Sequence, residues 1–268
     1  MSLTSKQGTA SMDFGKKQEQ FNSRFQELMA NKRKQVNSRL VLGVWGHPKT
    51  GKTGIALDFP DRPIYVLDWD KGVESTWREH HDSTERIQVY CPIEMNKDNI
   101  IDIQTSEENS HMFIKYVRSK IEEGERPVFV LDGVDTWLDS CILKINPNPT
   151  LVTKVMPFQY GARNKTFYHL LDSIYLLDCD IVYITHETEK YHDGTPIGMI
   201  ANWKDWGGKL EQEIHCSKKK VKGQIHFIAE LVGSRTNGNL VGTTWTVRQG
   251  TPPNIVWNGI PELREGKV

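Results

Sequence analysis

The residues most clearly suited to chemistry lie in one loop that contains two glycines and ends in lysine and threonine. Residues 46–53 read GHPKTGKT and match G-x-x-x-x-G-K-[ST], directly after the apolar run at 40–45. The glycines let the backbone curl so that successive N–H groups converge on phosphate oxygens. Lys52 would reach the β- and γ-phosphates as a point charge, and the Thr53 hydroxyl would bind Mg²⁺. A glycine-rich turn without a nucleotide is the simpler alternative. The predicted nucleotide-binding residues are Gly46, His47, Pro48, Lys49, Thr50, Gly51, Lys52 and Thr53.

A second candidate group is an aspartate at the end of a buried strand. Residues 128–131 are Val-Phe-Val-Leu, and Asp132 follows them. In nucleotide hydrolases a central strand brings such a carboxylate to the sheet edge beside the phosphate loop, where it holds Mg²⁺. A buried strand that ends in aspartate is common, so this prediction depends on the loop upstream. We expect Thr53 and Asp132 to share the metal ion, Asp132 through water.

The elements that must position these groups alternate along the chain. Short apolar runs predict buried strands, and patterns of helical period predict helices between them. This alternation predicts an α/β fold in which helices cover both faces of a mainly parallel sheet. The predicted strands lie at 40–45, 64–67, 87–90, 128–131 and 181–184, and the helices lie directly after the loop and at 110–123 and 161–177.

The C-terminal part of the sequence does not continue this alternation of strands and helices. The stretch 189–208 has no period and is expected to be a long loop. Residues 224–232 and 243–247 alternate as antiparallel strands around a turn at 237–239. This C-terminal antiparallel hairpin would extend the sheet at its edge.

Residues 1–39 are polar and are expected to form an N-terminal helical extension. This helix either packs on its own domain or docks on a neighbouring subunit, and the sequence leaves both interpretations open. Its apolar side chains near one helical face are Phe14, Phe21, Phe25, Leu28 and Met29. The predicted domains are the extension at 1–39, the ATPase core at 40–250 and a C-terminal tail at 251–268.

Composition limits the classes of function. The 268 residues carry 34 basic and 34 acidic side chains, so a nucleic acid would have to be bound by local patches. The four cysteines lack C-x-x-C spacing, which argues against a cysteine zinc site and a disulfide framework. The sequence shows no apolar segment of membrane-spanning length and no signal-peptide core. We therefore expect a cytoplasmic protein, in the host cytoplasm if it is viral, without a membrane partner.

In the order of these parts the chain resembles the RecA-like P-loop ATPases, most closely the small phage-type members associated with single-strand annealing and recombination. The resemblance covers roughly residues 40–250 and implies a RecA-like fold. The phosphate loop is specific for nucleotides, whereas the other pieces are short, so their order carries the assignment. These pieces are the loop at 46–53, the short helix, the strand and turn at 66–72, the acidic strand at 128–132, Tyr160-Gly161, residues 185–187 and the closing hairpin.

The resemblance implies catalytic roles at the strand ends. RecA-like enzymes place a carboxylate, usually Glu, just after the second strand to orient the attacking water. Asp70 stands at that position here and is one methylene shorter, which affects its reach. Asp68 is the competing candidate, with capping of the next turn as its structural interpretation. His186 matches the polar residue that senses the γ-phosphate, and a histidine that only satisfies a hydrogen bond is the alternative.

The region after His186 corresponds to the loop that touches DNA in RecA-like proteins. Its aromatic and basic residues suit stacking on single-stranded bases, with tryptophans that pack back on the domain as the alternative. A later basic patch either contacts phosphates or is only a solvated face. The residues concerned are Lys190, Tyr191, His192, Trp203, Lys204 and Trp206, and in the patch Lys218, Lys219 and Lys220.

Arg235 follows the first strand of the hairpin, where RecA-like filaments insert a cation into the neighbouring active site. Such an arginine finger in trans stabilises charge on the transferred phosphoryl group and requires a homo-oligomer, a ring or a filament. A turn arginine without this role is the alternative. The expected catalytic residues are Lys52, Asp70, Asp132, His186 and Arg235.

These observations together predict an Mg²⁺-dependent ATPase that acts on single-stranded DNA in recombination, annealing or repair. Bound ATP would order the loop after His186, and loss of the γ-phosphate would release it. Three alternatives stay open. The first is a small-molecule or nucleotide kinase, which has the same loop but usually carries an arginine-bearing lid. The second is a non-enzymatic assembly scaffold that binds ATP without turnover. The third is a viral motor subunit.

Overall fold

The computed structural model describes residues 18–27, 29, 39–59, 61–80, 85–147, 156–251 and 254–264. The chain divides into two units, Met1–Arg39 and Leu40–Val268. In the first unit, residues 18–27 are helical, and the exposed rings of Phe21 and Phe25 stack with centroids 6.2 Å apart. Phe14 and Leu28 lie outside the described residues. Both interpretations of this extension stay predictions.

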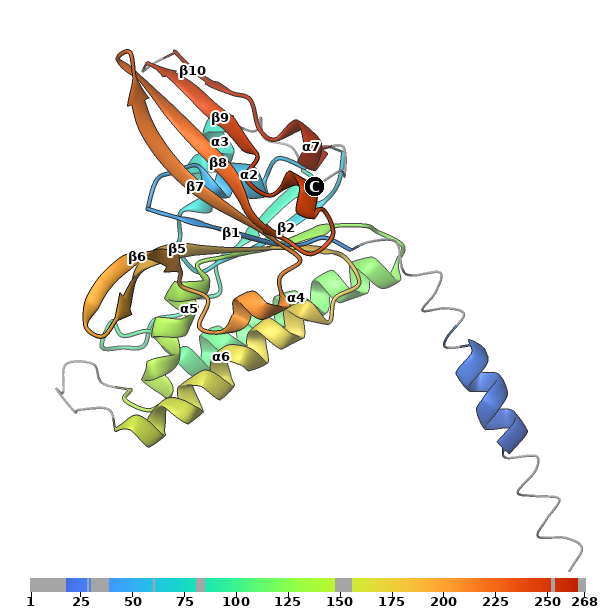
Figure 1. Cartoon of the computed structure of the whole chain (residues 1–268). Helices are drawn as coiled ribbons and strands as arrows, with labels where there is room; N and C mark the ends of the chain where they lie inside the picture. The colour runs from blue at the N-terminus through green and yellow to red at the C-terminus, as the bar shows by residue number, and fades with distance from the viewer. Residues whose placement is uncertain are drawn as a thin grey trace, which may run out of the picture. The chain divides into compact units, whose positions relative to one another are not determined.

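The second unit is built on a ten-stranded sheet with the order β10-β9-β8-β7-β1-β5-β4-β2-β3, with β6 paired to β5 (Figure 1). Strands β7, β1, β5, β4, β2 and β3 run parallel to their neighbours, and β8, β9 and β10 continue the sheet antiparallel. The strands are β1 (Val41–Gly46), β2 (Ile64–Asp68), β3 (Ile87–Tyr90), β4 (Val128–Asp132), β5 (Asp180–His192), β6 (Thr195–Ala201), β7 (Gln212–Val221), β8 (Gln224–Ser234), β9 (Thr244–Thr251) and β10 (Asn254–Trp257).

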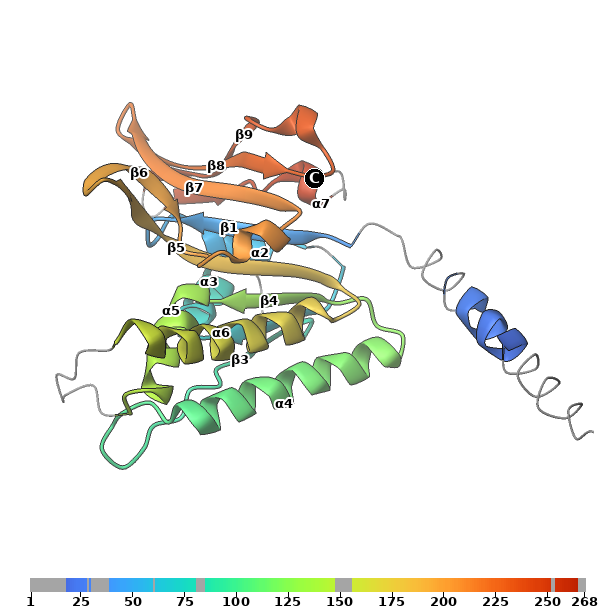
Figure 2. The same ribbon diagram turned by 60° about the horizontal axis from the view of Figure 1, so that its bottom comes forward.

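Helices cover both faces of the parallel part of this sheet. Figure 2 shows α4 and α6 lying along one face. The helices are α2 (Lys52–Ala56), α3 (Val73–His80), α4 (Ile103–Glu122), α5 (Val134–Ser140), α6 (Tyr160–Tyr175) and α7 (Pro261–Arg264), with short 3₁₀ turns η1 (Cys141–Lys144), η2 (Pro157–Gln159), η3 (Trp206–Lys209) and η4 (Gly238–Leu240). None of the described helices has the length and apolar character needed to cross a membrane.

Alternate side chains of the central strands enter two separate cores. Tyr65 and Leu67 of β2 pack in the core that contains the buried faces of α4 and α6, whereas Ile64 and Val66 pack in the core that contains α2. Side chains of a strand point alternately to the two faces, so a strand buried on both sides reads as a continuous apolar run. This explains why the sequence predicts these strands, and the predicted fold class is confirmed.

The stretch expected to be a long loop contains a hairpin instead. β5 continues as far as His192, and β6 pairs with it antiparallel. The turn between them is Asp193-Gly194, whose φ angles are 48° and 78°. Tight hairpin turns favour Asp-Gly because both residues adopt left-handed conformations. The prediction of a loop at 189–208 is therefore wrong up to Ala201, and the Asp-Gly pair is the signal that indicates the hairpin.

Strand β7 is the second element that the sequence reading missed. Its buried positions are Gln212, Ile214 and Cys216, so an amide interrupts the apolar alternation. The sheet also continues past residue 250, into the segment expected to be a tail. There β10 pairs with β9, and Ile260 is fully buried.

Candidate nucleotide site

The phosphate loop lies at the edge of the sheet where the parallel strands end. β1 pairs with β5 so that Gly46 is opposite His186, and β2 pairs with β4 so that Asp68 is opposite Asp132. Ligands of open α/β sheets bind at the carboxyl ends of the strands. The loop, the predicted metal ligand and the predicted phosphate sensor are therefore brought to one edge.

Glycine is required at the start of the loop because another strand passes against it. Gly46 has a φ angle of 148°, and a Cβ atom there would lie 2.1 Å from the carbonyl oxygen of Cys216 in β7. Gly51, with a φ angle of 91°, supplies the left-handed residue just before α2. The loop is thus shaped by its own glycines and by a strand that follows it much later in the chain.

Lys52 is held inside the loop by backbone carbonyl groups. Its Nζ donates hydrogen bonds to the carbonyl oxygens of Gly46 and His47, both at 3.0 Å. The residue is 6% exposed, and burial lowers the pKa of its ammonium, while nearby groups that include Asp132, Asp135 and Asp70 act in the opposite direction. A largely desolvated cation at this place attracts an anion strongly, because little water screens it.

Thr53 and Asp132 meet as the metal prediction requires. The Thr53 hydroxyl donates a 2.8 Å hydrogen bond to Oδ2 of Asp132, which is 3% exposed. Burial, followed by the charges of Asp70 and Asp68, raises the pKa of Asp132 to about 7. A hydroxyl oxygen beside a carboxylate oxygen, with further carboxylates nearby, is a donor set that fits a hard divalent cation such as Mg²⁺.

The structure places the two competing aspartates in different surroundings. Asp68 is buried, and its Oδ2 accepts a 3.2 Å hydrogen bond from the backbone N–H of Val73, the first residue of α3. Asp70 lines the cavity beside the phosphate loop and accepts a hydrogen bond from the Thr136 hydroxyl. Asp68 therefore caps a turn, whereas Asp70 faces the space where a nucleotide would react. The catalytic role of Asp70 stays a prediction.

Gly133 allows Asp70 to approach the end of β4. A Cβ atom at Gly133, which has a φ angle of 92°, would lie 2.6 Å from Oδ1 of Asp70. Any side chain here would displace the Asp70 carboxylate. The Asp-Gly pair that ends β4 is therefore required for packing as well as for its backbone conformation.

His186 is paired with an acid that the sequence reading did not assign. Its Nδ1 lies 2.9 Å from Oδ2 of Asp135, and its backbone N–H donates to Oδ1 of the same carboxylate at 3.3 Å. The hydrogen bond to Asp135 raises the pKa of His186 against the effect of burial. Burial raises the pKa of Asp135, but the bond and charge of His186 outweigh it, and the net pKa is lowered. The pair thus favours the imidazolium form of His186. Nδ1 of His186 is also 3.9 Å from Oδ2 of Asp70.

The space between these groups is a cavity of about 670 Å³, and one wall of it comes from the C-terminal strands. Phe227 of β8, Arg248 of β9 and Trp257 of β10 form this wall. A Cβ atom at Gly54 would lie 2.7 Å from the Trp257 ring, so the indole packs directly on α2. The sequence predicted the hairpin but not this wall, because only the strand order shows that the hairpin passes beside the loop.

Arg235 lies at the other end of the sheet. It follows Ser234, which pairs with Gln212 and through it with Leu42, near the start of β1. The side chain donates to the carbonyl oxygen of Gly208. Leu42 lies four steps along the strand from Gly46, or roughly 13 Å. Arg235 therefore does not line the cavity of its own subunit, and its role as a finger in trans stays a prediction.

Two predicted nucleic-acid residues need correction. Trp203 and Trp206 are only 5% and 2% exposed, and the Trp206 ring packs against that of Tyr183 with centroids 5.7 Å apart. Burial of such large rings stabilises the core between β5 and the helical layer. They therefore offer no stacking surface. Lys204 is also engaged locally, with its Nζ 3.0 Å from Oδ2 of Asp205.

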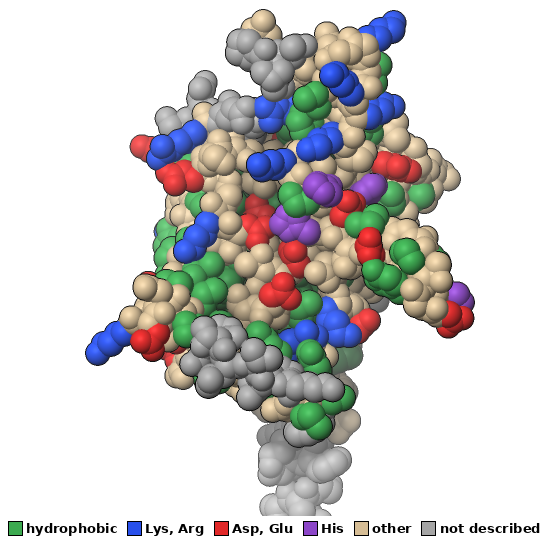
Figure 3. Space-filling model, turned by 90° about the vertical axis from the view of Figure 1, so that its left-hand side faces the viewer, with side chains coloured by type: hydrophobic (Ala, Val, Ile, Leu, Met, Phe, Trp, Pro, Cys, Tyr) green, Lys and Arg blue, Asp and Glu red, His purple; other side chains and the backbone are tan. Residues whose placement is uncertain are grey.

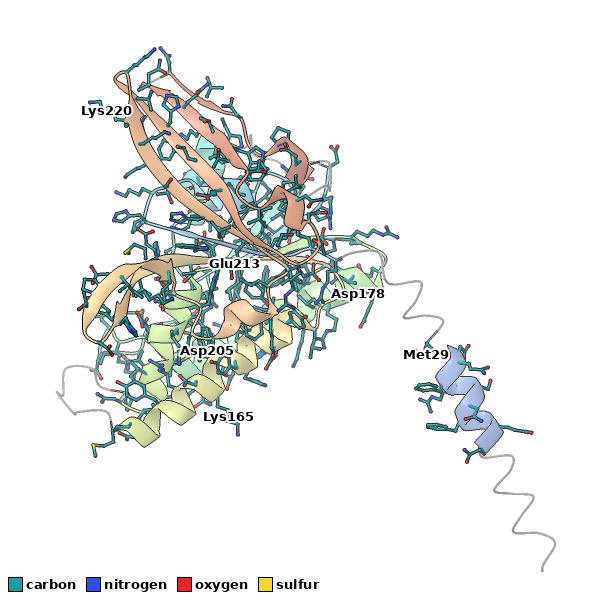
Figure 4. The ribbon with its side chains drawn as sticks, viewed as in Figure 1. Met29, Lys165, Asp178, Asp205, Glu213 and Lys220 are labelled. Carbon is teal, nitrogen blue, oxygen red and sulfur yellow. The ribbon has the colours of Figure 1, made fainter. Side chains whose placement is uncertain are left out.

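The other predicted nucleic-acid residues lie on two projecting hairpins. Lys190 is exposed on the β5–β6 hairpin, and Lys218, Lys219 and Lys220 are exposed toward the end of the β7–β8 hairpin. Figure 4 labels Lys220 near the tip of this second hairpin. In Figure 3, lysine and arginine side chains gather above a central group of acidic side chains and histidines. Basic side chains thus share this face with acidic groups.

Comparison with known proteins agrees with the geometry of the loop. A family model described as an AAA domain matches residues 38–241. No curated protein matches the sequence. Among solved structures, the chain is similar to a KaiC-like protein from the hyperthermophilic archaeon Pyrococcus horikoshii OT3, with a TM-score of 0.48 and 9% identity over 81% of this chain and 88% of that chain. Because the family model covers more than half of the sequence, the chain belongs to the AAA domain family of P-loop ATPases.

Proposed function

We propose that this protein hydrolyses ATP with Mg²⁺ at the phosphate-loop edge and couples the reaction to binding of single-stranded DNA by its two hairpins. The observation that carries the proposal is the meeting of the Thr53–Asp132 pair with Asp70 and His186 around one cavity. A loop that only binds phosphate needs neither of the last two residues. Their position supports turnover rather than a passive scaffold.

The nucleotide would be bound from two sides. The loop amides and Lys52 would hold the phosphates, as convergent donors and a desolvated cation do. Thr53 and Asp132 would hold Mg²⁺, which neutralises charge on the β- and γ-phosphates when it is bound. Phe227 and Trp257 also line the cavity and would pack against the nucleoside.

Asp70 would orient the attacking water. The water oxygen forms a bond to the γ-phosphorus while the bond from this phosphorus to the β–γ bridging oxygen breaks, which releases ADP and phosphate. The hydrogen bond from Thr136 would hold the carboxylate in one orientation. The water proton passes to the carboxylate or to the phosphate product.

His186 would link the γ-phosphate to the DNA-binding hairpins. The pairing with Asp135 favours a cationic imidazole at the end of the parallel part of β5, and the same strand continues into the β5–β6 hairpin. An anionic γ-phosphate would attract this cation, and its release would remove the attraction. The position of one strand would thus depend on the state of the nucleotide.

DNA binding would rest on the exposed lysines of the hairpins, since the formal net charge of the chain is zero. We expect single-stranded DNA to stimulate ATP turnover and the stimulation to fade as salt rises. Replacement of Lys218, Lys219 and Lys220 by alanine would make the negative slope of log affinity against log salt shallower by about 0.7 per lost phosphate contact. The matched control is Lys165→Ala, an exposed lysine of α6, which should keep the wild-type slope.

The test is ATP turnover with and without single-stranded DNA over a salt series, with DNA affinity measured on the same samples. If turnover ignores DNA at every salt concentration, the coupling to DNA is wrong while the ATPase assignment stands. If the triple variant and the Lys165 control share the wild-type slope, DNA binds elsewhere on the molecule.

A further inference from the structure

A second group of potential metal ligands lies in the helical layer. Glu107 and His111 are four residues apart on α4, and His169 comes from the neighbouring α6. Each offers one ligand atom, and these three atoms lie within 4.8 Å of one another. None of the three is among the described residues that line the nucleotide cavity. This cluster therefore needs an explanation of its own.

The spacing of the cluster is close to that of ligands that share one ion. Zn²⁺ binds histidine nitrogen and carboxylate oxygen at about 2.0–2.2 Å, so two ligands of a tetrahedral ion lie about 3.4 Å apart. Nδ1 of His169 is 3.7 Å from Oε1 of Glu107, too far for a hydrogen bond. The rings of His111 and His169 have centroids 4.8 Å apart and are tilted by 53°. His169 is the exposed member of the cluster, so its ring is the one with room to adjust.

Two further observations indicate a ligand at this place. Nε2 of His111 is buried and has no hydrogen-bond partner among the described residues, which is costly for a polar atom unless something binds it. Lys144 of η1 contacts Oε2 of Glu107 at 2.5 Å. This contact orients the carboxylate and leaves its other oxygen directed to the histidines, as the outer partners of metal ligands commonly do.

We propose that Glu107, His111 and His169 bind a zinc-type divalent transition metal ion that joins α4 to α6. Two imidazoles and one carboxylate suit Zn²⁺ rather than Mg²⁺ or Ca²⁺, which prefer sites made of oxygen ligands alone. The fourth position would be open to water, since the His169 side chain is 66% exposed. The ion would stabilise the helices that lead into β4 and β5, the strands that carry Asp132 and His186.

The test is a titration of the full-length, nucleotide-free chain without a histidine tag, stripped of metal and then given Co²⁺ alone. We expect one equivalent to bind with the visible absorption of a four-coordinate N/O site. The His169→Ala variant should lower the affinity roughly tenfold or more, and Glu107→Gln should do the same. His169 is exposed, so its variant should fold normally, which the circular dichroism spectrum checks.

Two control variants separate this site from the rest of the chain. His192→Ala, at an exposed histidine of the β5–β6 hairpin, should bind Co²⁺ as the wild type does. His186→Ala is the second control, because Asp70, Asp135 and His186 form the other described cluster that could hold a metal ion. If the ion binds in the helical layer, this variant should also retain Co²⁺ binding. Loss of the signal in His186→Ala but not in His169→Ala would overturn the proposal, and so would the absence of stoichiometric binding by the wild type.

Discussion

The phosphate-loop edge and the β5–β6 hairpin are built in opposite ways. At the edge, Lys52 and Asp132 are buried, and each is hydrogen-bonded to neighbouring groups. On the β5–β6 hairpin, by contrast, Tyr191 and Ile197 are 58% and 54% exposed. The edge is arranged before any nucleotide arrives, whereas the β5–β6 hairpin is supported mainly by its own strand pairing. Regions with few buried contacts open and move most easily, so this hairpin suits a partner that must be captured and released.

The largest effect on binding is expected from removing the buried cation, Lys52. Lys52→Ala should weaken ATP binding roughly 100-fold, because a desolvated charge-assisted contact to phosphate is lost. Isothermal titration with a non-hydrolysable ATP analogue measures this. Lys165→Ala, an exposed lysine of α6, should bind the analogue normally. Unchanged affinity in a folded Lys52→Ala protein would contradict the site.

A second test uses the raised pKa of Asp132. Its pKa of about 7 lies above the ordinary 3.8, so the metal-free folded protein holds a proton that the unfolded chain releases between these pH values. The stability due to this group therefore falls as pH rises from about 4 to 7. At pH 8, Asp132→Asn should raise the free energy of unfolding of the metal-free protein by roughly 1–4 kcal/mol.

The same variant should lose its response to Mg²⁺. In the wild type, Mg²⁺ should raise the melting temperature at pH 8 more than at pH 6, because the metal needs the ionised carboxylate. Thermal melts of both proteins with and without Mg²⁺ measure this difference. A response to Mg²⁺ that is equal at the two pH values, or that persists in Asp132→Asn, would place the metal elsewhere.

The smallest expected effect concerns the C-terminal wall of the cavity. Trp257→Ala should weaken ATP binding about tenfold, since stacking of a base on an aromatic ring is worth about 1–3 kcal/mol. Val256→Ala is the matched control, because this neighbour is 58% exposed and does not line the cavity among the described residues. Equal affinities of the two variants would show that the wall does not contact the nucleoside.

The edge could be predicted from the sequence because its chemistry is tied to local patterns. The loop at 46–53 and the strand that ends at Asp132 each need specific residues in a fixed order. The strand before the loop, β1, and the strand that ends at Asp132, β4, are both apolar on two faces. The hairpins were harder to predict. β7 buries Gln212 beside its apolar positions, and β6 is exposed along most of its length, so neither strand shows the apolar pattern that predicts a buried strand.

The rest of the site depends on contacts between distant segments. The pairing of Asp135 with His186 joins residues 51 apart in the sequence. Trp257 contacts α2 only because β10, at the end of the sheet, lies beside the loop. Periodicity cannot report either contact. The burial of Trp203 and Trp206 is similar, because a mixture of aromatic and basic residues reads alike in an exposed loop and in one that packs on the core.

The measurement that tests the central claim most directly is ATP turnover by Asp70→Asn beside Asp68→Asn, at saturating ATP and Mg²⁺, with nucleotide affinity measured on the same samples. Asp70→Asn should bind ATP within threefold of the wild type and turn it over roughly 100-fold more slowly, as loss of a positioned carboxylate does. Asp68→Asn retains an oxygen that can accept the hydrogen bond from Val73 and should keep most of its turnover per folded molecule. Normal turnover by Asp70→Asn, or no hydrolysis by the wild type with or without single-stranded DNA, would contradict the account.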